Sequence, residues 1–220
     1  MSLAYWFQEQ PAEPVEEGCI RHGPGEGLPK LIFQSLDASR AVVKKIATVD
    51  RVRRKIILIQ PSDKALYLSG LRERGVPGYV YIFAHARSNS LQGVTRQDII
   101  VDLIRRSGIW HGQPIMIDAC NAGAEPEGIA SSLALALRTF VTAPTTTTWN
   151  YAMGGSAIGQ GAFEKLPGVL AGLPFPDLFR PGRWRTWGPD GKPIASTRTS
   201  PRDGGELVKG PLADVLMKKP

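Results

Sequence analysis

The sequence is poor in the residues that hold metals and disulfide frameworks. It has two cysteines and three histidines in 220 residues, without the spacing of a zinc site. The glycine-rich stretch 154–159 is not followed by the Lys-Ser/Thr of a phosphate-binding loop. We therefore expect neither a metal nor a cofactor. Cys19 and Cys120 could form one disulfide, but their settings, a Gly/Glu/Pro-rich segment and the end of an apolar run, argue against that pairing and fit a reducing compartment.

Long apolar runs and a secretory leader are also lacking. No stretch approaches the roughly 18 apolar residues of a membrane span. The first 18 residues have neither the basic start nor the apolar centre of a signal peptide. We therefore expect no membrane partner. The expected location is the cytoplasm or, through a specialised secretion system, outside the cell.

The net charge of +7 is spread unevenly along the chain. Residues 1–30 are acidic, whereas residues 40–55 and the stretch from Arg180 onward are basic. This bias permits binding to nucleic acid or to an acidic partner. However, the chain lacks zinc-finger spacing, an RNA-binding aromatic signature and a basic amphipathic helix. A solvated basic surface is the favoured interpretation, and a nucleic-acid-binding tail is the weakest of three hypotheses.

The order of apolar and polar segments indicates three parts. Residues 1–49 form a Pro/Gly-rich arm, with a possible strand at 31–33 and a helix predicted from Ala41 to Val52. Residues 50–160 form a core, and residues 161–220 form a Pro/Gly/Trp-rich extension. In the core, apolar runs predict strands at 55–60, 79–85, 114–120 and 140–144, and helices at 95–106 and from Pro126 onward.

Strand–helix–strand alternation of this kind predicts an α/β fold. We expect right-handed crossovers and a mostly parallel central sheet that is flanked by helices. Functional groups of such a sheet gather at the carboxyl ends of its strands. His85 ends one predicted strand and Cys120 ends the next, so the single crossover between them predicts that both lie at one edge.

A cysteine and a histidine at one sheet edge can carry out nucleophilic catalysis. A thiolate attacks a carbonyl carbon, and an imidazole takes the thiol proton or protonates the leaving amine. Each residue alone is more often structural, Cys120 as a small buried hydrophobe and His85 as a satisfied histidine. Their shared position at strand ends predicts that they work as a pair.

Two stretches resemble the caspase–haemoglobinase group (clan CD) of cysteine peptidases. They are the strand that ends in His85, Val80-Tyr81-Ile82-Phe83-Ala84-His85, and the strand and turn around Cys120, Ile115-Met116-Ile117-Asp118-Ala119-Cys120-Asn121-Ala122-Gly123. The group includes caspases, legumains, clostripain-like and gingipain-like enzymes and toxin self-processing domains. The resemblance covers about half of the chain, roughly residues 55–150.

The resemblance implies a three-layer caspase-like fold and a His/Cys dyad. His85 would be the general acid/base and Cys120 the nucleophile, with an oxyanion hole formed by the backbone N–H groups of Cys120 and Ala86. The family generally has Gly directly after the histidine, where this chain has Ala86. The caspase Gln-Ala-Cys-Xaa-Gly is also replaced here, so aspartate specificity does not carry over.

Two further residues are candidates for substrate binding. Asp118 could line a pocket or orient a neighbour, and Trp149 ends the predicted loop 145–149, in a region that shapes the specificity pocket in relatives of this kind. For each of them a structural role is the alternative. We read His22 and His111, which lie in glycine-flanked loops, as incidental.

The sequence therefore supports two main hypotheses from different classes. The first is a cysteine endopeptidase that cleaves protein or peptide substrates. Its compact core and Trp/Pro/Gly-rich tail suggest a bacterial effector or self-processing toxin domain, which a larger delivery or regulatory protein could accompany. The alternative is a catalytically silent caspase-like scaffold that binds a protein partner, an interpretation that Ala86 favours.

Overall fold

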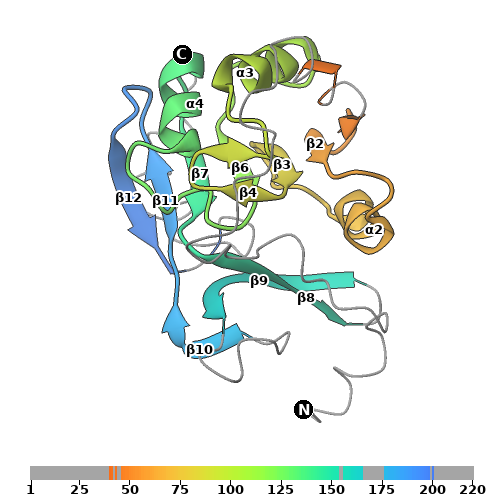
Figure 1. Cartoon of the computed structure of the whole chain (residues 1–220), viewed down its shortest axis with the longest axis vertical. Helices are drawn as coiled ribbons and strands as arrows, with labels where there is room; N and C mark the ends of the chain where they lie inside the picture. The colour runs from red at the N-terminus through yellow and green to blue at the C-terminus, as the bar shows by residue number, and fades with distance from the viewer. Residues whose placement is uncertain are drawn as a thin grey trace, which may run out of the picture.

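A seven-stranded mixed sheet forms the centre of the molecule (Figure 1). The computed structural model describes residues 40–41, 43, 46–153, 156–165, 176–198 and 200. The strand order is β1-β2-β3-β6-β7-β11-β12. The strands are β1 (Thr48–Asp50), β2 (Lys55–Leu58), β3 (Val80–Ala84), β6 (Ile115–Asp118), β7 (Val141–Pro144), β11 (Trp184–Trp187) and β12 (Pro193–Thr197).

The four inner strands β2, β3, β6 and β7 are parallel to one another. The other three pair antiparallel, β1 with β2, and β11 with both β7 and β12. The predicted α/β class is confirmed, and the large central sheet is mostly parallel to mixed. The predicted strands at 55–60, 79–85, 114–120 and 140–144 correspond to these four inner strands.

Both faces of the sheet are covered. Helices α3 (Gln97–Arg106) and α4 (Ile129–Leu137) pack on one face, and α2 (Lys64–Arg72) packs on the other. A three-stranded sheet of β8 (Thr147–Met153), β9 (Ser156–Lys165) and β10 (Pro176–Pro181) contributes Ala162 to the α2 side. We call the two faces the α3/α4 face and the α2 face. None of the helices in the described part of the chain has the length and apolarity that crossing a membrane requires.

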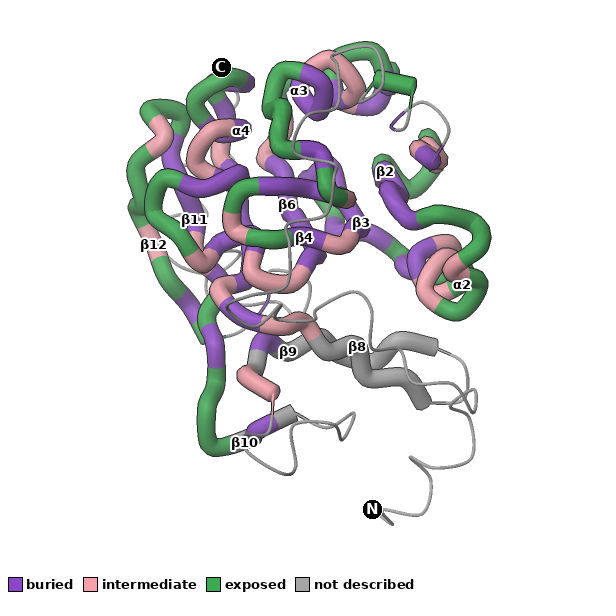
Figure 2. Tube along the Cα trace, in the orientation of Figure 1, coloured by how far each residue is buried: buried purple, intermediate pink, exposed green. Residues whose placement is uncertain are grey.

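Alternation along the inner strands explains why their sequences are apolar throughout. Val80, Ile82 and Ala84 of β3 lie on the α3/α4 face, whereas Tyr81 and Phe83 lie on the α2 face. Strands that are buried on both faces read as continuous apolar runs. The central strands are accordingly purple in Figure 2, which marks buried residues.

The crossovers do not all have the expected hand. Strands β2, β3, β6 and β7 are neighbours in chain order, so each crossover steps across the sheet in the same direction. The crossover through α2 passes over one face, and those through α3 and α4 pass over the other. Equal steps over opposite faces have opposite hands, so the expectation of uniformly right-handed crossovers is wrong.

The predicted helix from Ala41 to Val52 is too long. Arg40, Ala41, Val43 and Ile46 are helical, but Thr48–Asp50 forms strand β1. The β-branched Thr48 and Val49 pair with Ile57 and Ile56, so tertiary pairing overrides the helical spacing. Val52 lies in the β1–β2 turn and is exposed. The possible strand at 31–33 lies outside the described residues.

Two helix starts also differ from the prediction, and one helix was missed. Helix α3 begins at Gln97, with Arg96 and not Thr95 at the capping position. Helix α4 begins at Ile129, three residues beyond Pro126, after Gly128. Helix α2 was not predicted, because its short apolar stretch carries a weak periodic signal.

The Pro/Gly/Trp-rich extension contributes to the central sheet. Strand β11 pairs with β7, and its Trp184 and Trp187 are fully buried. The indole N–H of Trp187 donates to the backbone oxygen of Pro126 at 2.9 Å. The predicted boundary at residue 160 falls within β9. The described strands β11 and β12 are therefore part of the same sheet as the core.

A buried lysine fixes the end of α2. The ammonium group of Lys55 donates to the backbone oxygens of Gly70, Leu71 and Glu73 at 2.7, 2.6 and 2.8 Å. Cations at a helix C-terminus are favourable because they bond its unpaired carbonyls. Burial lowers the pKa of Lys55, and nearby Asp50 opposes this effect. Lys55 therefore ties β2 to α2.

We predict that Lys55→Met lowers the free energy of unfolding by about 2–4 kcal/mol, because three buried carbonyls lose their donor. Urea unfolding followed by tryptophan fluorescence measures the change. Lys64→Met is the matched control, since Lys64 is exposed at the start of α2, and it should change stability by less than about 0.5 kcal/mol. Equal midpoints for the two variants would contradict the anchoring role of Lys55.

Candidate active site at the carboxyl edge of the sheet

His85 and Cys120 follow the ends of two neighbouring parallel strands. Strand β3 pairs with β6 in a register that runs from Val80↔Ile115 to Phe83↔Asp118. His85 comes one residue after β3 and Cys120 two residues after β6, so both lie at the carboxyl edge of the sheet. Both residues are half-buried. The prediction that these two strands are parallel and end at one edge is confirmed.

The two residues also belong to the same face of the sheet. Tyr81 and Phe83 precede His85 on the α2 face, and Met116 precedes Cys120 on it. Strand alternation continues this face to His85 and Cys120. Their contacts agree, because His85 bonds Asp63 just before α2 and Cys120 lies 3.8 Å from the hydroxyl of Thr148 in β8.

His85 is held by its ring and by its backbone. Its Nε2 lies 3.1 Å from Oδ2 of Asp63. Its backbone oxygen accepts from the N–H of Gln92 at 2.7 Å, and its own N–H donates to Oε1 of Gln92 at 3.4 Å. The residues that follow form a small hairpin of β4 (Ala86–Arg87) and β5 (Ser90–Leu91).

The hairpin after His85 is seated on α4. The backbone oxygen of Ser88, at its tip, accepts from the N–H of Ile129 at 2.7 Å, the first residue of the helix. A Cβ on Gly128 would lie 2.2 Å from this oxygen, so glycine allows the close approach. The segment after Cys120 leads into α4, so this contact joins the segments that follow the two candidate residues.

Sequence reasoning missed Asp63. It is the N-cap of α2, and its Oδ1 accepts from the N–H of Leu66 at 3.4 Å. One carboxylate therefore caps a helix and contacts the histidine. The signal was available, because an aspartate shortly after Pro61 is a typical helix start. Asp63 was not recognised because helix α2 itself was not predicted.

The turn after Cys120 is tied to the end of β7 and the segment that follows it. The N–H of Asn121 donates to Thr146 O at 2.9 Å, and the N–H of Gly123 donates to Pro144 O at 2.8 Å. Asn121 has φ of 60°, a left-handed conformation that asparagine tolerates. A Cβ on Gly123 would lie 2.6 Å from Ala143 O, so this position requires glycine.

Cys120 is disulfide-bonded in the structure. The sequence contains one other cysteine, Cys19, which lies outside the described residues. The expectation that Cys120 is unpaired is therefore wrong. Its sulfur has to be reduced before it can act as a nucleophile.

The structure places the remaining predicted residues differently. Asp118 is 1% exposed on the α2 face, and the hydroxyl of Tyr81 donates to its Oδ2. Ala86 pairs with Leu91, and its side chain is buried among apolar residues of the α3/α4 face. Trp149 lies within β8, opposite Gly161, so the predicted loop 145–149 is wrong from Thr147 onward. The side chain of Trp149 is outside the described residues.

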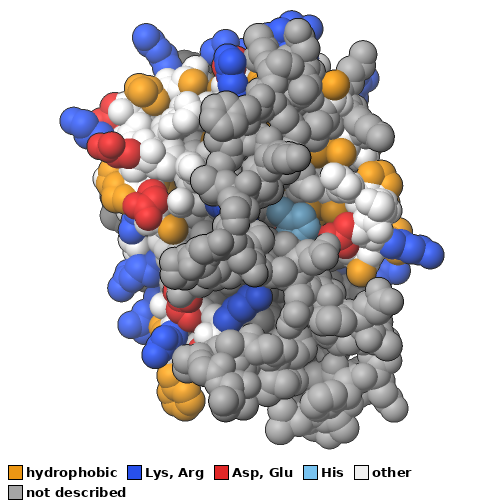
Figure 3. All heavy atoms as spheres, in the orientation of Figure 1, with side chains coloured by type: hydrophobic (Ala, Val, Ile, Leu, Met, Phe, Trp, Pro, Cys, Tyr) orange, Lys and Arg blue, Asp and Glu red, His pale blue; other side chains and the backbone are white. Residues whose placement is uncertain are grey.

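Of the other histidines, His111 is exposed and His22 lies outside the described residues. Within the described ranges, no group of His, Cys, Asp and Glu side chains is arranged to hold a metal ion. The Lys and Arg side chains that Figure 3 shows occur at several separate places in that view.

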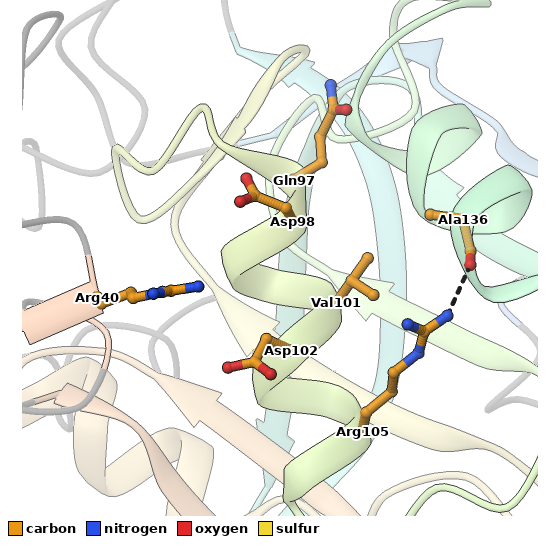
Figure 4. A pocket seen from close by; sticks show the side chains of 7 residues that line it. All are labelled: Arg40, Gln97, Asp98, Val101, Asp102, Arg105 and Ala136. Carbon is orange, nitrogen blue, oxygen red and sulfur yellow. Dashed lines mark hydrogen bonds between the residues drawn. The ribbon is translucent and has the colours of Figure 1, made fainter. Parts of the chain in front are cut away.

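A surface pocket of about 460 Å³ lies away from the two candidate residues, along α3 (Figure 4). Asp98, Asp102 and Arg105 extend from this helix, and Arg105 donates to the backbone oxygen of Ala136 in α4 at 3.1 Å. The lining carries charges of both signs and no nucleophile. It consists of Arg40, Gln97, Asp98, Val101, Asp102, Arg105 and Ala136.

A family model described as "Domain of unknown function (DUF8616)" matches residues 55–158. The match begins with β2, ends in β9 and includes both His85 and Cys120. Neither the comparison with curated proteins nor the comparison with solved structures found a match. The matched segment thus contains the candidate site, without a function attached to it.

We predict that Gly123→Ala disrupts the turn that carries Cys120. The added methyl group collides with the backbone of β7, so we expect a loss of about 2 kcal/mol or more in unfolding free energy. Gly188→Ala is the control, because the nearest atom to its Cβ is the side-chain Oδ1 of Asp190 at 3.1 Å. Denaturant unfolding of both variants measures the difference, and similar losses would argue against a constrained turn at Gly123.

Proposed function

We propose that the chain is a cysteine endopeptidase in which His85 and Cys120 form a catalytic dyad. The observation that carries this proposal is the register of β3 and β6, which brings the two residues to one edge and one face of the sheet. With it we propose a caspase-like three-layer arrangement. The helices α3 and α4 on one face, and α2 with the β8–β9 hairpin on the other, support it.

The proposed reaction is acyl transfer in two steps. The Cys120 thiolate attacks the carbonyl carbon of the scissile peptide bond, and imidazolium His85 protonates the leaving amine as the C–N bond breaks. Water then hydrolyses the thioester, with His85 taking a proton from the water and returning it to the thiolate. Backbone N–H groups of Cys120 and Ala86 would bind the oxyanion of each tetrahedral intermediate.

The disulfide at Cys120 has a direct consequence for this chemistry. A sulfur in a disulfide has no thiolate to attack with, so the proposed enzyme is inactive until Cys120 is reduced. A dithiol reductant supplies two electrons and two protons, which convert the disulfide into two protein thiols while the reductant forms its own disulfide. Activity should therefore depend on reductant.

The substrate is proposed to be a protein or peptide. Trp149 in β8 stays a candidate for substrate contact, since Thr148 beside it in sequence contacts Cys120. Burial of Asp118 favours a supporting role beneath Cys120 over direct contact with substrate. A role as a bacterial effector or self-processing toxin domain, with a larger delivery or regulatory protein, is part of this proposal.

A second candidate function is a silent caspase-like scaffold that binds a protein partner. Ala86, which directly follows His85, favours this function. Its side chain is buried in the core, at a position where caspase–haemoglobinase peptidases generally have glycine. Its extra methyl group fixes the backbone that would form half of the oxyanion hole. The scaffold predicts an ordinary thiol at Cys120.

We predict that a peptidyl electrophile labels Cys120 only after reduction and that Cys120→Ala abolishes the labelling. The rate should fall by about 10²-fold or more in His85→Ala, because the imidazole no longer activates the thiol. Intact mass and peptide mapping locate the label, and self-cleavage on storage is followed in parallel. Cys19→Ser is the matched control, since it leaves Cys120 no intramolecular disulfide partner and should be labelled without reductant.

Labelling at the rate of a simple thiol such as glutathione, unchanged in His85→Ala and without cleavage of unstructured protein substrates, would refute the peptidase. That result would favour the scaffold.

A further inference from the structure

Among the described residues, the side-chain hydrogen-bond partner of the His85 imidazole is the carboxylate of Asp63. Its Oδ2 lies 3.1 Å from Nε2, while its Oδ1 accepts from the N–H of Leu66. We infer that Asp63 is a positioning residue that fixes the orientation and the tautomer of His85. The inference deepens the proposed function and rests on it for its catalytic meaning.

The chemistry of the contact determines which ring nitrogen carries the proton. An ionised carboxylate only accepts hydrogen bonds, so Nε2 of His85 has to donate to it. In the neutral ring Nδ1 is then the unprotonated nitrogen, and its lone pair can take the proton of the Cys120 thiol. When it does, the imidazolium forms beside a carboxylate of opposite charge.

The position of Asp63 is set by the packing of α2 on the strand that carries His85. A Cβ on Gly70, near the other end of the helix, would lie 2.7 Å from Cδ1 of Phe83 in β3. Lys55 holds the last turn of the same helix. Helix α2 is therefore fixed at its C-terminus and pressed against β3, and its N-cap is presented to His85.

Partial exposure of the pair decides which effect of Asp63 dominates. The side chains of His85 and Asp63 are 25% and 37% exposed, so water screens the attraction between their charges. Water does not screen the requirement that one atom of the pair donates the hydrogen bond and the other accepts it. We therefore assign Asp63 to orienting the ring and selecting its tautomer more than to electrostatic stabilisation.

Asp63→Asn is the decisive variant, because it separates the two functions of the carboxylate. The amide oxygen can still cap α2 at Leu66, while the amide NH₂ takes the place of Oδ2 and donates to Nε2. Nε2 then becomes an acceptor, and the proton moves to Nδ1. The thiol of Cys120 loses its proton acceptor although the helix cap is preserved.

The test uses the full-length chain with Cys120 reduced. The ¹⁵N chemical shifts of the His85 ring report its tautomer, and the rate of labelling by the peptidyl electrophile reports the activation of Cys120. We expect Nε2–H in the wild type, Nδ1–H in Asp63→Asn, an unchanged urea midpoint, and labelling slower by at least about 10²-fold. Asp63→Ser keeps a capping hydroxyl, cannot invert the tautomer, and should lose less activity than Asp63→Asn.

Two results would overturn the inference. One is a tautomer that does not change in Asp63→Asn, and the other is an inverted tautomer with an unchanged labelling rate in a wild type that labels rapidly. Failure of the proposed function looks different, because wild-type Cys120 would then react as an ordinary thiol. In that case the NMR measurement still decides whether Asp63 sets the tautomer of His85.

Discussion

The register between β3 and β6 is the constraint on which the candidate site depends. A shift of one residue along either strand would turn every side chain of that strand to the opposite face. If β3 were the strand that shifted, His85 would point toward α3 and α4 while Cys120 stayed on the α2 face. Both strands are buried on both faces, so such a shift would also disrupt the packing of apolar side chains in the cores on either side of the sheet. This packing therefore maintains the geometry of the site.

Much of this arrangement could be predicted from local sequence. The four inner strands are continuous apolar runs bounded by prolines, glycines and charged residues, and α3 has a well-defined apolar face. The parallel direction of the strands followed from the alternation of strands and helices, and it predicted the shared edge of His85 and Cys120. These features are local or follow from chain order, and tertiary packing reinforces them.

The features that escaped prediction depend on distant contacts. Thr48 and Val49 form a strand because β2 offers them a partner, and β11 enters the sheet because β7 has a free edge and buried space for two tryptophans. Helix α2 is stabilised by Lys55, which lies before the helix in the chain and is bonded to its last turn. The contact between Asp63 and His85 depends on the position of that helix and joins residues 22 positions apart, so local sequence does not predict it.

The position of β11 has a consequence for where the folding unit ends. The family match stops at residue 158, whereas the sheet needs Trp184–Trp187 to cover β7. A chain that ended with the matched segment would leave β7 as an edge strand with open backbone donors and acceptors, a template for pairing with other chains. It would also lose the indole that holds Pro126 in the segment between Cys120 and α4. The segment that sequence comparison detects is therefore shorter than the segment that can fold without leaving β7 as an unpaired edge strand.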